Sequence, residues 1–275
     1  MTLNSLTQDQ IKEFVRHRYA AIAVGSSGTD CAPASSCSGS GASSCCGSKA
    51  TPGVDDLAAR MGYAPSDVEA AGQGNLGLGC GNPQAIADLR PGEVVVDLGS
   101  GAGFDCFLAA RQVGASGRVI GVDMTHEMLA RARANATQMN LPHVEFRLGE
   151  IEHLPVADNS ADVIISNCVI NLSPDKPQVF REAFRALKSG GRLAVSDVVL
   201  TRPLPPQVSS TLEMFGGCIG GAACVDDLTH WLAEAGFQDV RIDLRAESRD
   251  LIRDWAPGQG VEDYVVSAAI WARKP

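Results

Sequence analysis

The segment Val94-Val95-Val96-Asp97-Leu98-Gly99-Ser100-Gly101-Ala102-Gly103 joins three β-branched residues to a loop with glycines at alternate positions. β-Branched residues favour a buried strand, and glycine permits a tight turn and the close approach of a ligand to the backbone. The next stretch, Phe104 to Val113, has a helical pattern and is followed by Gly114. This strand, loop and helix predict a parallel sheet that binds a ligand at the carboxyl end of its first strand.

The remainder of the chain repeats this alternation of strands and helices. Further strands are expected at Arg118 to Val122, Val144 to Leu148, Asp162 to Ser166, Arg192 to Val199, Val240 to Leu244 and Tyr264 to Trp271. Helices are expected from Thr125 to about Met139, around Phe180 to Leu187 with an end at Gly190-Gly191, and from Val225 to Ala235. Alternating strands and helices predict an α/β fold with a mostly parallel sheet and helices on both faces.

Before this region the sequence is less regular. A capping box at Thr7 and Gln10 predicts a helix to about Val24, Val54 to Met61 reads as a helix ending at Gly62, and Asn82 caps a short helix with Pro83 first. Between them, residues 25–50 are rich in Ser, Gly, Ala and Cys and cannot bury a core. We therefore divide the chain into an N-terminal Cys-rich part (1–75), a ligand-binding core (76–200) and C-terminal elements (201–275) that complete the sheet.

Composition limits the possible partners. A net charge of −9 over 275 residues argues against nucleic acid, which is bound mainly through clustered Lys and Arg. The sequence has no run of about twenty apolar residues for a membrane span and no apolar signal segment at its start. We expect a cytoplasmic protein that contacts neither nucleic acid nor membrane.

The chain has nine cysteines, an odd number that does not suggest a disulfide framework in a reducing compartment. Four lie in the Ser/Gly-rich part, at Cys31, Cys37, Cys45 and Cys46. Among the other five, Cys106 falls within the first core helix and is expected to be a packed small residue. Cys224 stands at the start of a helix and is expected to be structural or incidental.

The acids around the glycine loop restrict its ligand. Phe104 stands where a dinucleotide fingerprint needs its last glycine, and a P-loop's Lys-Ser/Thr ending is absent. Asp97 disfavours a pyrophosphate and favours a cation or amino group. Asp123 ends the second strand, twenty residues after Gly103, where it can accept ribose hydroxyls. Residues 149–152, Gly-Glu-Ile-Glu, would border an adenine. A ligand with an ammonium and a sulfonium fits this set.

These motifs resemble those of class I S-adenosylmethionine-dependent methyltransferases from about Pro91 to the last residue. The resemblance implies a Rossmann-like sheet of about seven strands whose last strand is antiparallel. It also implies that S-adenosylmethionine is the cofactor. The implied cofactor-binding residues are Asp97, Gly99, Ser100, Gly101, Gly103, Asp123, Met124, Glu150, Ile151 and Asn167. The motifs are specific for the cofactor but not for the methyl acceptor.

Three further cysteines fall in loops that should surround the same cleft. Cys80 precedes the first strand, Cys168 follows the fourth and Cys218 lies after the fifth. Three converging thiolates suit a soft ion or metalloid. Structural zinc usually takes four ligands, often in closely spaced pairs and with His, and this sequence shows no such pattern. Trivalent arsenic takes three thiolates and keeps a lone pair on its open side.

The stretches around these cysteines resemble the short bacterial arsenite methyltransferases. The similar segments are residues 75–83 (NLGLGCGNP), 166–176 (SNCVINLSPDK), the glycine-flanked Cys218 and the adjacent Cys45-Cys46. The resemblance implies that Cys80, Cys168 and Cys218 bind As(III), and that either Cys45 or Cys46 pairs with Cys80 during a redox cycle. It further implies arsenite and methylarsenite, as thiol adducts, for substrates, thioredoxin or glutathione as reductant, and a role in arsenic detoxification.

Two other interpretations stay open at this stage. A small-molecule methyltransferase acting on quinone-type carbon or oxygen acceptors shares the cofactor motifs but gives the cysteines no role. A thiol-rich metal-binding protein would use residues 25–50 to buffer thiophilic ions and would not consume S-adenosylmethionine. The roles of Cys31 and Cys37, the final methylation state of the product, activity on antimony and the oligomeric state are not specified by the sequence.

Overall fold

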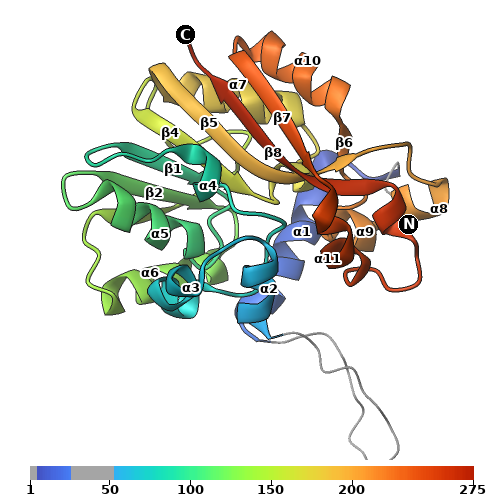
Figure 1. Cartoon of the computed structure of the whole chain (residues 1–275), viewed down its shortest axis with the longest axis horizontal. Helices are drawn as coiled ribbons and strands as arrows, with labels where there is room; N and C mark the ends of the chain where they lie inside the picture. Colours follow the sequence, from blue (N-terminus) through green and yellow to red (C-terminus); the bar gives the residue numbers. More distant parts are fainter. Residues whose placement is uncertain (1–4, 26–52) are drawn as a thin grey trace, which may run out of the picture.

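A computed structural model describes residues 5–25 and 53–275 of the chain. Its centre is one twisted sheet with helices on both faces (Figure 1). The strands follow the order β3-β2-β1-β4-β5-β8-β7, and β6 pairs with β5 outside this path. Their bounds are β1 Val94–Leu98, β2 Arg118–Asp123, β3 Val144–Leu148, β4 Ala161–Asn167, β5 Leu187–Leu200, β6 Ala223–Cys224, β7 Gln238–Arg245 and β8 Val265–Arg273.

The sheet is parallel except for one strand. β8 runs antiparallel between β5 and β7, whereas β1 to β5 pair in parallel with their neighbours. The predicted α/β fold with an antiparallel last strand is therefore confirmed. The two-residue β6 is an addition that the sequence pattern did not reveal, since it is too short to show a periodicity.

Alternate strand residues pack against different helix layers. Val95 lies in a buried cluster with residues of α5 (Phe104–Val113) and α6 (His126–Gln138). Its neighbour Val96 points the other way, into a cluster with α7 (Lys176–Ala186) and α10 (Val225–Ala235). The period of two in a strand distributes one apolar run over both faces, as a buried parallel strand requires.

A third cluster closes the carboxyl end of β5. This cluster contains three cysteines, Cys80, Cys168 and Cys218. They pack with residues of the helices α1 (Gln8–Ala23), α8 (Pro206–Ser209), α9 (Leu212–Gly216) and α11 (Arg249–Arg253). Figure 1 shows α1, α9 and α11 grouped at this end of the molecule. Helices from both ends of the chain thus cover the place where the sequence puts its ligand loop.

The N-terminal helical expectations are mostly confirmed. α1 has the predicted capping box, in which Thr7 and Gln10 exchange side-chain and backbone hydrogen bonds. α2 (Val54–Arg60) also lies where it was expected, and α4 (Gln84–Ala87) starts one residue after Pro83. The sequence reading missed α3 (Pro65–Ala71), α8, α9 and α11, which have at most seven residues each. Helices of this length depend on tertiary packing more than on their own pattern.

The predicted end of α7 at Gly190-Gly191 is wrong. The helix ends at Ala186, because Leu187 is already extended and pairs with Ala161 at the start of β5. The register between β4 and β5 then shifts before it resumes at Val163 and Arg192. The two glycines therefore lie in an irregular part of the strand and not at a helix end.

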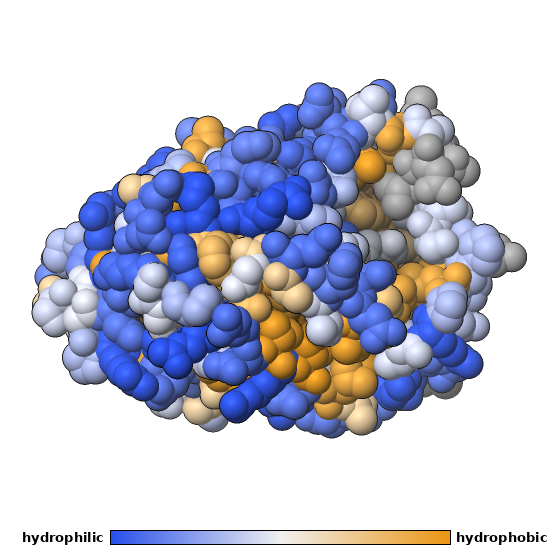
Figure 2. All heavy atoms as spheres, turned by 90° about the horizontal axis from the view of Figure 1, so that it is seen from above, coloured by the Kyte–Doolittle hydropathy of each residue, from blue (hydrophilic) through white to orange (hydrophobic). Residues whose placement is uncertain are grey.

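The described surface is largely polar, with an apolar area on the face seen in Figure 2. None of the helices in residues 5–25 and 53–275 has the length and hydropathy that crossing a bilayer requires. Cys31, Cys37, Cys45 and Cys46 lie outside the described residues.

Replacing Phe180 with Ala should lower the free energy of unfolding by about 3–5 kcal/mol, because this ring is fully buried between α7 and the sheet. Chemical denaturation monitored by circular dichroism checks this expectation. Leu244→Ala is the control, since Leu244 is half exposed on β7 and its loss should change stability little. Equal effects of the two substitutions would contradict the assigned core.

Candidate active site

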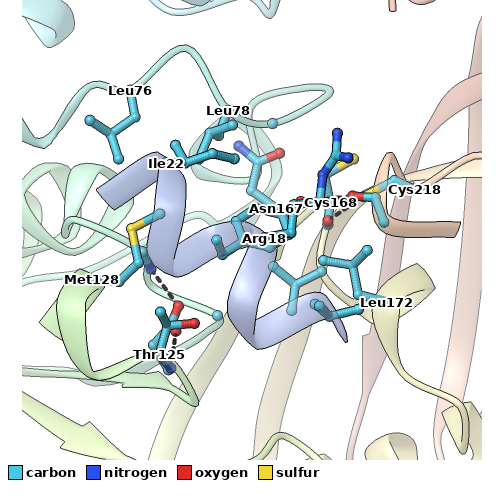
Figure 3. A pocket seen from close by; sticks show the side chains of 18 of the residues that line it. Arg18, Ile22, Leu76, Leu78, Thr125, Met128, Asn167, Cys168, Leu172 and Cys218 are labelled. Atoms are coloured by element: carbon cyan, nitrogen blue, oxygen red, sulfur yellow. Dashed lines mark hydrogen bonds between the residues drawn. The ribbon is translucent and has the colours of Figure 1, made fainter. Parts of the chain in front are cut away.

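A cavity of about 610 Å³ opens at the carboxyl ends of β1, β2 and β4. The glycine loop after β1 forms one wall, and α1 lies across the cavity as a second wall (Figure 3). Loops that contain Leu76 and Leu78 on one side and Cys218 on the other complete it. The cavity is therefore built from segments that are far apart in the sequence but meet at one end of the sheet.

The glycine loop is fixed between two strand ends. Gly99 has a φ of +68°, and a Cβ there would lie 2.4 Å from Val169 Cγ2, so no other residue fits. The backbone N–H of Gly101 donates to Asp123 Oδ2 at 2.9 Å, and Asp123 Oδ1 accepts from the Thr125 N–H at 2.8 Å. A Cβ at Gly101 would meet no atom within 4 Å. The Gly101 N–H thus anchors the loop to Asp123, whereas the space beside the Gly101 Cα is open.

Two buried acids face the cavity beside this loop. Burial and the neighbouring Asp105 raise the pKa of Asp97 well above its ordinary value, and burial also raises the pKa of Asp105. Cys106 donates to Asp97 at 3.2 Å, and the Tyr63 hydroxyl donates to Asp105 at 2.7 Å. No basic side chain among the described residues pairs with either carboxyl. A ligand ammonium is the group that such a pair accommodates.

Most of the predicted cofactor-binding residues line this cavity. They are Asp97, Gly99, Ser100, Gly101, Asp123, Met124, Ile151 and Asn167. Ser100 Oγ is buried and has no hydrogen-bond partner in the described part of the chain, which leaves it free for a polar ligand atom.

Gly103 and Glu150 are not among the lining residues. Gly103 has a φ of +97° and starts α5, where a Cβ would lie 2.5 Å from the Phe107 ring. Glu150 forms an ion pair of 2.7 Å with Lys12 of α1. The first residue shapes the loop, and the second holds α1 against the cavity.

Asn167 connects the cavity with the loop that carries Cys80. Its side-chain amide donates to the Tyr63 hydroxyl and to the Gly81 carbonyl, both at 2.9 Å, and to Asp105 at 3.2 Å. Its Oδ1 accepts from the Cys80 N–H at 3.1 Å. Asn167 therefore fixes the position of Cys80 relative to the buried acids. It also lines the cavity, so the cofactor contact that its place in the sequence suggested stays a prediction.

The three predicted ligand cysteines converge behind the cavity. Cys80, Cys168 and Cys218 are 2%, 7% and 4% exposed, and the last two line the same end of the cavity from two separate segments (Figure 3). The Cys218 thiol donates to the Cys168 carbonyl at 2.9 Å. Cys168 and Cys218 have φ values of +59° and +65°, a conformation that costs non-glycine residues energy.

The pKa values of these thiols are raised, so the thiols are protonated in the ligand-free protein. Burial is the main cause for Cys80, and for Cys218 the main cause is its hydrogen bond with Cys168, followed by burial. A buried cluster of protonated thiols can exchange its protons for a thiophilic centre.

Sequence reasoning missed several residues of this site. Asp105 stands in the first turn after the glycine loop, and an acid there could have been noticed. Asp197 interrupts the apolar run of β5, and burial raises its pKa to about 6 against hydrogen bonds from Val198 and Asn171. Tyr19 donates to the Gly216 carbonyl at 3.4 Å and reaches Cys218 from α1. No sequence signal could have placed α1 here, since only tertiary packing brings it to the cleft.

The remaining two described cysteines have structural positions, as expected. Cys106 is fully buried in the cluster between α5, α6 and the sheet. The Cys224 sulfur accepts from the Asp227 N–H at 3.4 Å and caps α10.

Comparison with known proteins defines the class. A methyltransferase-domain family model matches residues 89–236, which contain the glycine loop, Asp123 and both Cys168 and Cys218. A crystal structure of an arsenic(III) S-adenosylmethionine methyltransferase from Chlamydomonas reinhardtii superposes with a TM-score of 0.60 and 34% identity, covering 82% of this chain and 75% of that one. The fold is that of a class I methyltransferase.

Sequence relatives narrow the class further. The chain is 50% identical over 268 residues to an arsenite methyltransferase of Halobacterium salinarum, which covers 97% of this chain and 67% of that protein. It is 38% identical over 175 residues to the mouse arsenite methyltransferase, or 60% of this chain and 46% of the relative. The chain belongs to the arsenite methyltransferase family, and it spans only about half the length of the mouse member.

Replacing Asp97 with Asn should stabilise the ligand-free protein at pH 7 and weaken binding of the methyl donor on the order of 10-fold or more. The raised pKa means that the folded state keeps a proton that the unfolded state releases. Stability therefore falls as pH rises from the ordinary pKa of Asp to the raised one, and the cost persists above it. The amide removes this cost, and its advantage should vanish below about pH 4.

Denaturant unfolding at several pH values, together with calorimetric titration of the donor, measures both effects. Asp243→Asn on the exposed part of β7 is the control and should change neither quantity. Destabilisation of the ligand-free Asp97→Asn protein at pH 7 would show that the carboxyl is not an unpaired buried acid.

Proposed function

We propose that this protein transfers methyl groups from S-adenosylmethionine to trivalent arsenic held by Cys80, Cys168 and Cys218, for arsenic detoxification. The observation that carries the proposal is the convergence of three buried thiols, from three separate loops, beside the glycine-loop cavity, which Cys168 and Cys218 line. The names of the algal, archaeal and mammalian relatives agree with this acceptor.

The residues of the cavity fit the donor part by part. Asp97 and Asp105 are neighbouring buried carboxyls on the described cavity wall, and neither has a basic side chain as partner. They therefore suit the ammonium group. Asp123 lies at the end of β2, where its carboxylate can accept ribose hydroxyls, and Met124 and Ile151 offer apolar surface to the adenine. When bound, S-adenosylmethionine supplies an electrophilic methyl group on a sulfonium.

Arsenic enters by exchange with the protonated thiols. Each enzyme thiol forms a sulfur–arsenic bond as a carrier thiol leaves with the proton, so no free thiolate accumulates. Three such exchanges give a neutral tris-thiolate whose lone pair occupies the open side of arsenic. Cys168 and Cys218 line the cavity, so the open side of that site faces the place of the donor. Catalysis then depends mainly on holding the two reacting atoms in line with water excluded.

Methyl transfer leaves arsenic formally pentavalent, and two enzyme thiols reduce it as they become a disulfide. By family resemblance, Cys80 and either Cys45 or Cys46 perform this step, after which thioredoxin or glutathione restores the thiols. Arsenite and methylarsenite enter as thiol adducts in this scheme. The scheme requires a reducing compartment such as the cytoplasm.

Incubation with labelled methyl donor, arsenite and a thiol, followed by separation of arsenic species, tests the proposal. Label in methylated arsenic is the expected result. Transfer of label to a quinone-type acceptor without arsenic would assign the protein to a different acceptor class. Stoichiometric arsenic binding without consumption of the donor would indicate a metal-binding protein.

Replacing Cys168 or Cys218 with Ser should lower methylation of both arsenite and methylarsenite by at least about 100-fold, because a hydroxyl is a poor ligand for a soft centre. Chromatography of the arsenic products measures the loss. Cys224→Ser is the matched control and should keep full activity, since Cys224 only caps α10. Full activity of Cys168→Ser on either substrate contradicts the three-thiolate site.

A further inference from the structure

Asp197 lies directly beside the thiol cluster although nothing in the proposed reaction uses it. Its carboxylate and the sulfur atoms of Cys80 and Cys168 lie within 4.8 Å of one another. The side chain is 3% exposed and lies with Ser196 between two apolar stretches of β5. A buried carboxylate in this position is costly and requires a compensating role.

Hydrogen bonds and a nearby cation offset part of the cost of burying the Asp197 carboxylate. The backbone N–H of Val198 donates to it at 2.8 Å and that of Asn171 at 3.2 Å. Lys176 of α7 is the nearby cation. The side-chain amide of Asn171 meanwhile donates to the Val198 and Cys218 carbonyls, at 2.6 and 3.3 Å. The same small network therefore orients the carboxylate and the Cys218 loop.

Thiol activation does not explain this carboxylate. The negative charge of Asp197 contributes to the raised pKa of all three cysteines, so it opposes formation of thiolates. A benefit must therefore arise after arsenic has replaced the thiol protons. Arsenic(III) with three thiolates is neutral, so its binding adds no positive charge with which Asp197 could interact.

Charge changes at this point only when the methyl group arrives. The arsenic lone pair forms the arsenic–carbon bond, and the carbon–sulfur bond breaks with its electron pair going to the donor sulfur. The positive charge leaves the sulfonium and appears on arsenic, which is oxidised from the trivalent to the pentavalent state. No proton moves in this step.

We propose that the Asp197 carboxylate stabilises the positive charge that develops on arsenic during methyl transfer, an inference that rests on the proposed function. Cys168 and Cys218 line the cavity, whereas Asp197 and Cys80 do not. The carboxylate thus lies behind the arsenic site and leaves the side toward the donor open. A fixed anion in a water-excluded site acts on the transition state without reorganisation.

Asp197→Asn keeps the size of the side chain and one of its two acceptor oxygens, so it removes the charge together with one of the hydrogen bonds from the Val198 and Asn171 N–H groups. Arsenite should still bind through three sulfurs, with an affinity within about 3-fold of the native protein, because the bound complex is neutral. The single-turnover rate of methyl transfer from arsenic-loaded protein should fall on the order of 100-fold. Asp197→Glu, which retains the charge, should recover part of the rate.

The matched control is Asp162→Asn. Asp162 lies on β4 near its opposite end, where it pairs with Lys188 at 2.8 Å, and its neutralisation should leave the single-turnover rate unchanged. Arsenite affinity is measured by titration, and the sulfur coordination of arsenic by X-ray absorption, so that binding and rate are separated.

Three results would overturn the inference. A native rate in Asp197→Asn would leave the proposed function intact but remove the electrostatic role. Loss of arsenite binding in both Asp197→Asn and Asp197→Glu would make Asp197 part of the scaffold of the thiol cluster. Failure of the native chain itself to methylate arsenite would overturn the proposed function and this inference together.

Discussion

The register between β4 and β5 is the constraint on which the site depends. Asn167 pairs with Ser196, and the next residue, Cys168, donates its N–H to the Ser196 carbonyl at 2.8 Å. This pairing places Cys168 beside Asp197 and directs the Asn167 amide toward the Cys80 loop. A slip of one residue would turn each of these side chains to the opposite face. Both faces of β4 and β5 are apolar, so the cost of such a slip would fall on the buried polar residues at the end of β5, Ser196 and Asp197, which would lose their partners.

The site has buried carboxyl groups both where the methyl donor is expected to bind and beside the proposed arsenic site. Asp97 and Asp105 stand where a cationic donor is bound, and Asp197 stands behind the acceptor. Each of these carboxyls destabilises the ligand-free fold, since burial raises its pKa and no ligand compensates it there. The left-handed backbone at Cys168 and Cys218 adds to this cost. Binding of the donor regains the stability that is lost at Asp97 and Asp105, whereas the charge that Asp197 is proposed to stabilise appears only during methyl transfer.

The sequence predicted the parts of the molecule that have strong local patterns. The β-branched run before Asp97, the alternate glycines and the helix at Phe104 identify the fold and the donor loop without any tertiary information. Cys80, Cys168 and Cys218 could be placed at one cleft because strand ends of a parallel sheet meet at the same edge. The resemblance to arsenite methyltransferases then indicated that the methyl acceptor bound by these cysteines is As(III).

The rest depended on contacts that no local pattern contains. Tyr19 and Lys12 reach the cavity only because α1 packs across it. Asn167 lines the cavity, but the sequence could not show that its amide also donates to Tyr63, Gly81 and Asp105. Asp197 was read as one residue of a strand, since sequence alone does not show that its carboxylate ends beside two thiols.

X-ray absorption at the arsenic edge tests the central claim most directly. The sample is the full chain with Cys31, Cys37, Cys45 and Cys46 replaced by Ser and loaded with one equivalent of arsenite, so that Cys80, Cys168 and Cys218 are the cluster left to bind it. Three sulfur neighbours and no oxygen neighbour are the predicted first shell. An arsenic centre with oxygen in its first shell, or with two sulfurs or fewer, would contradict the account.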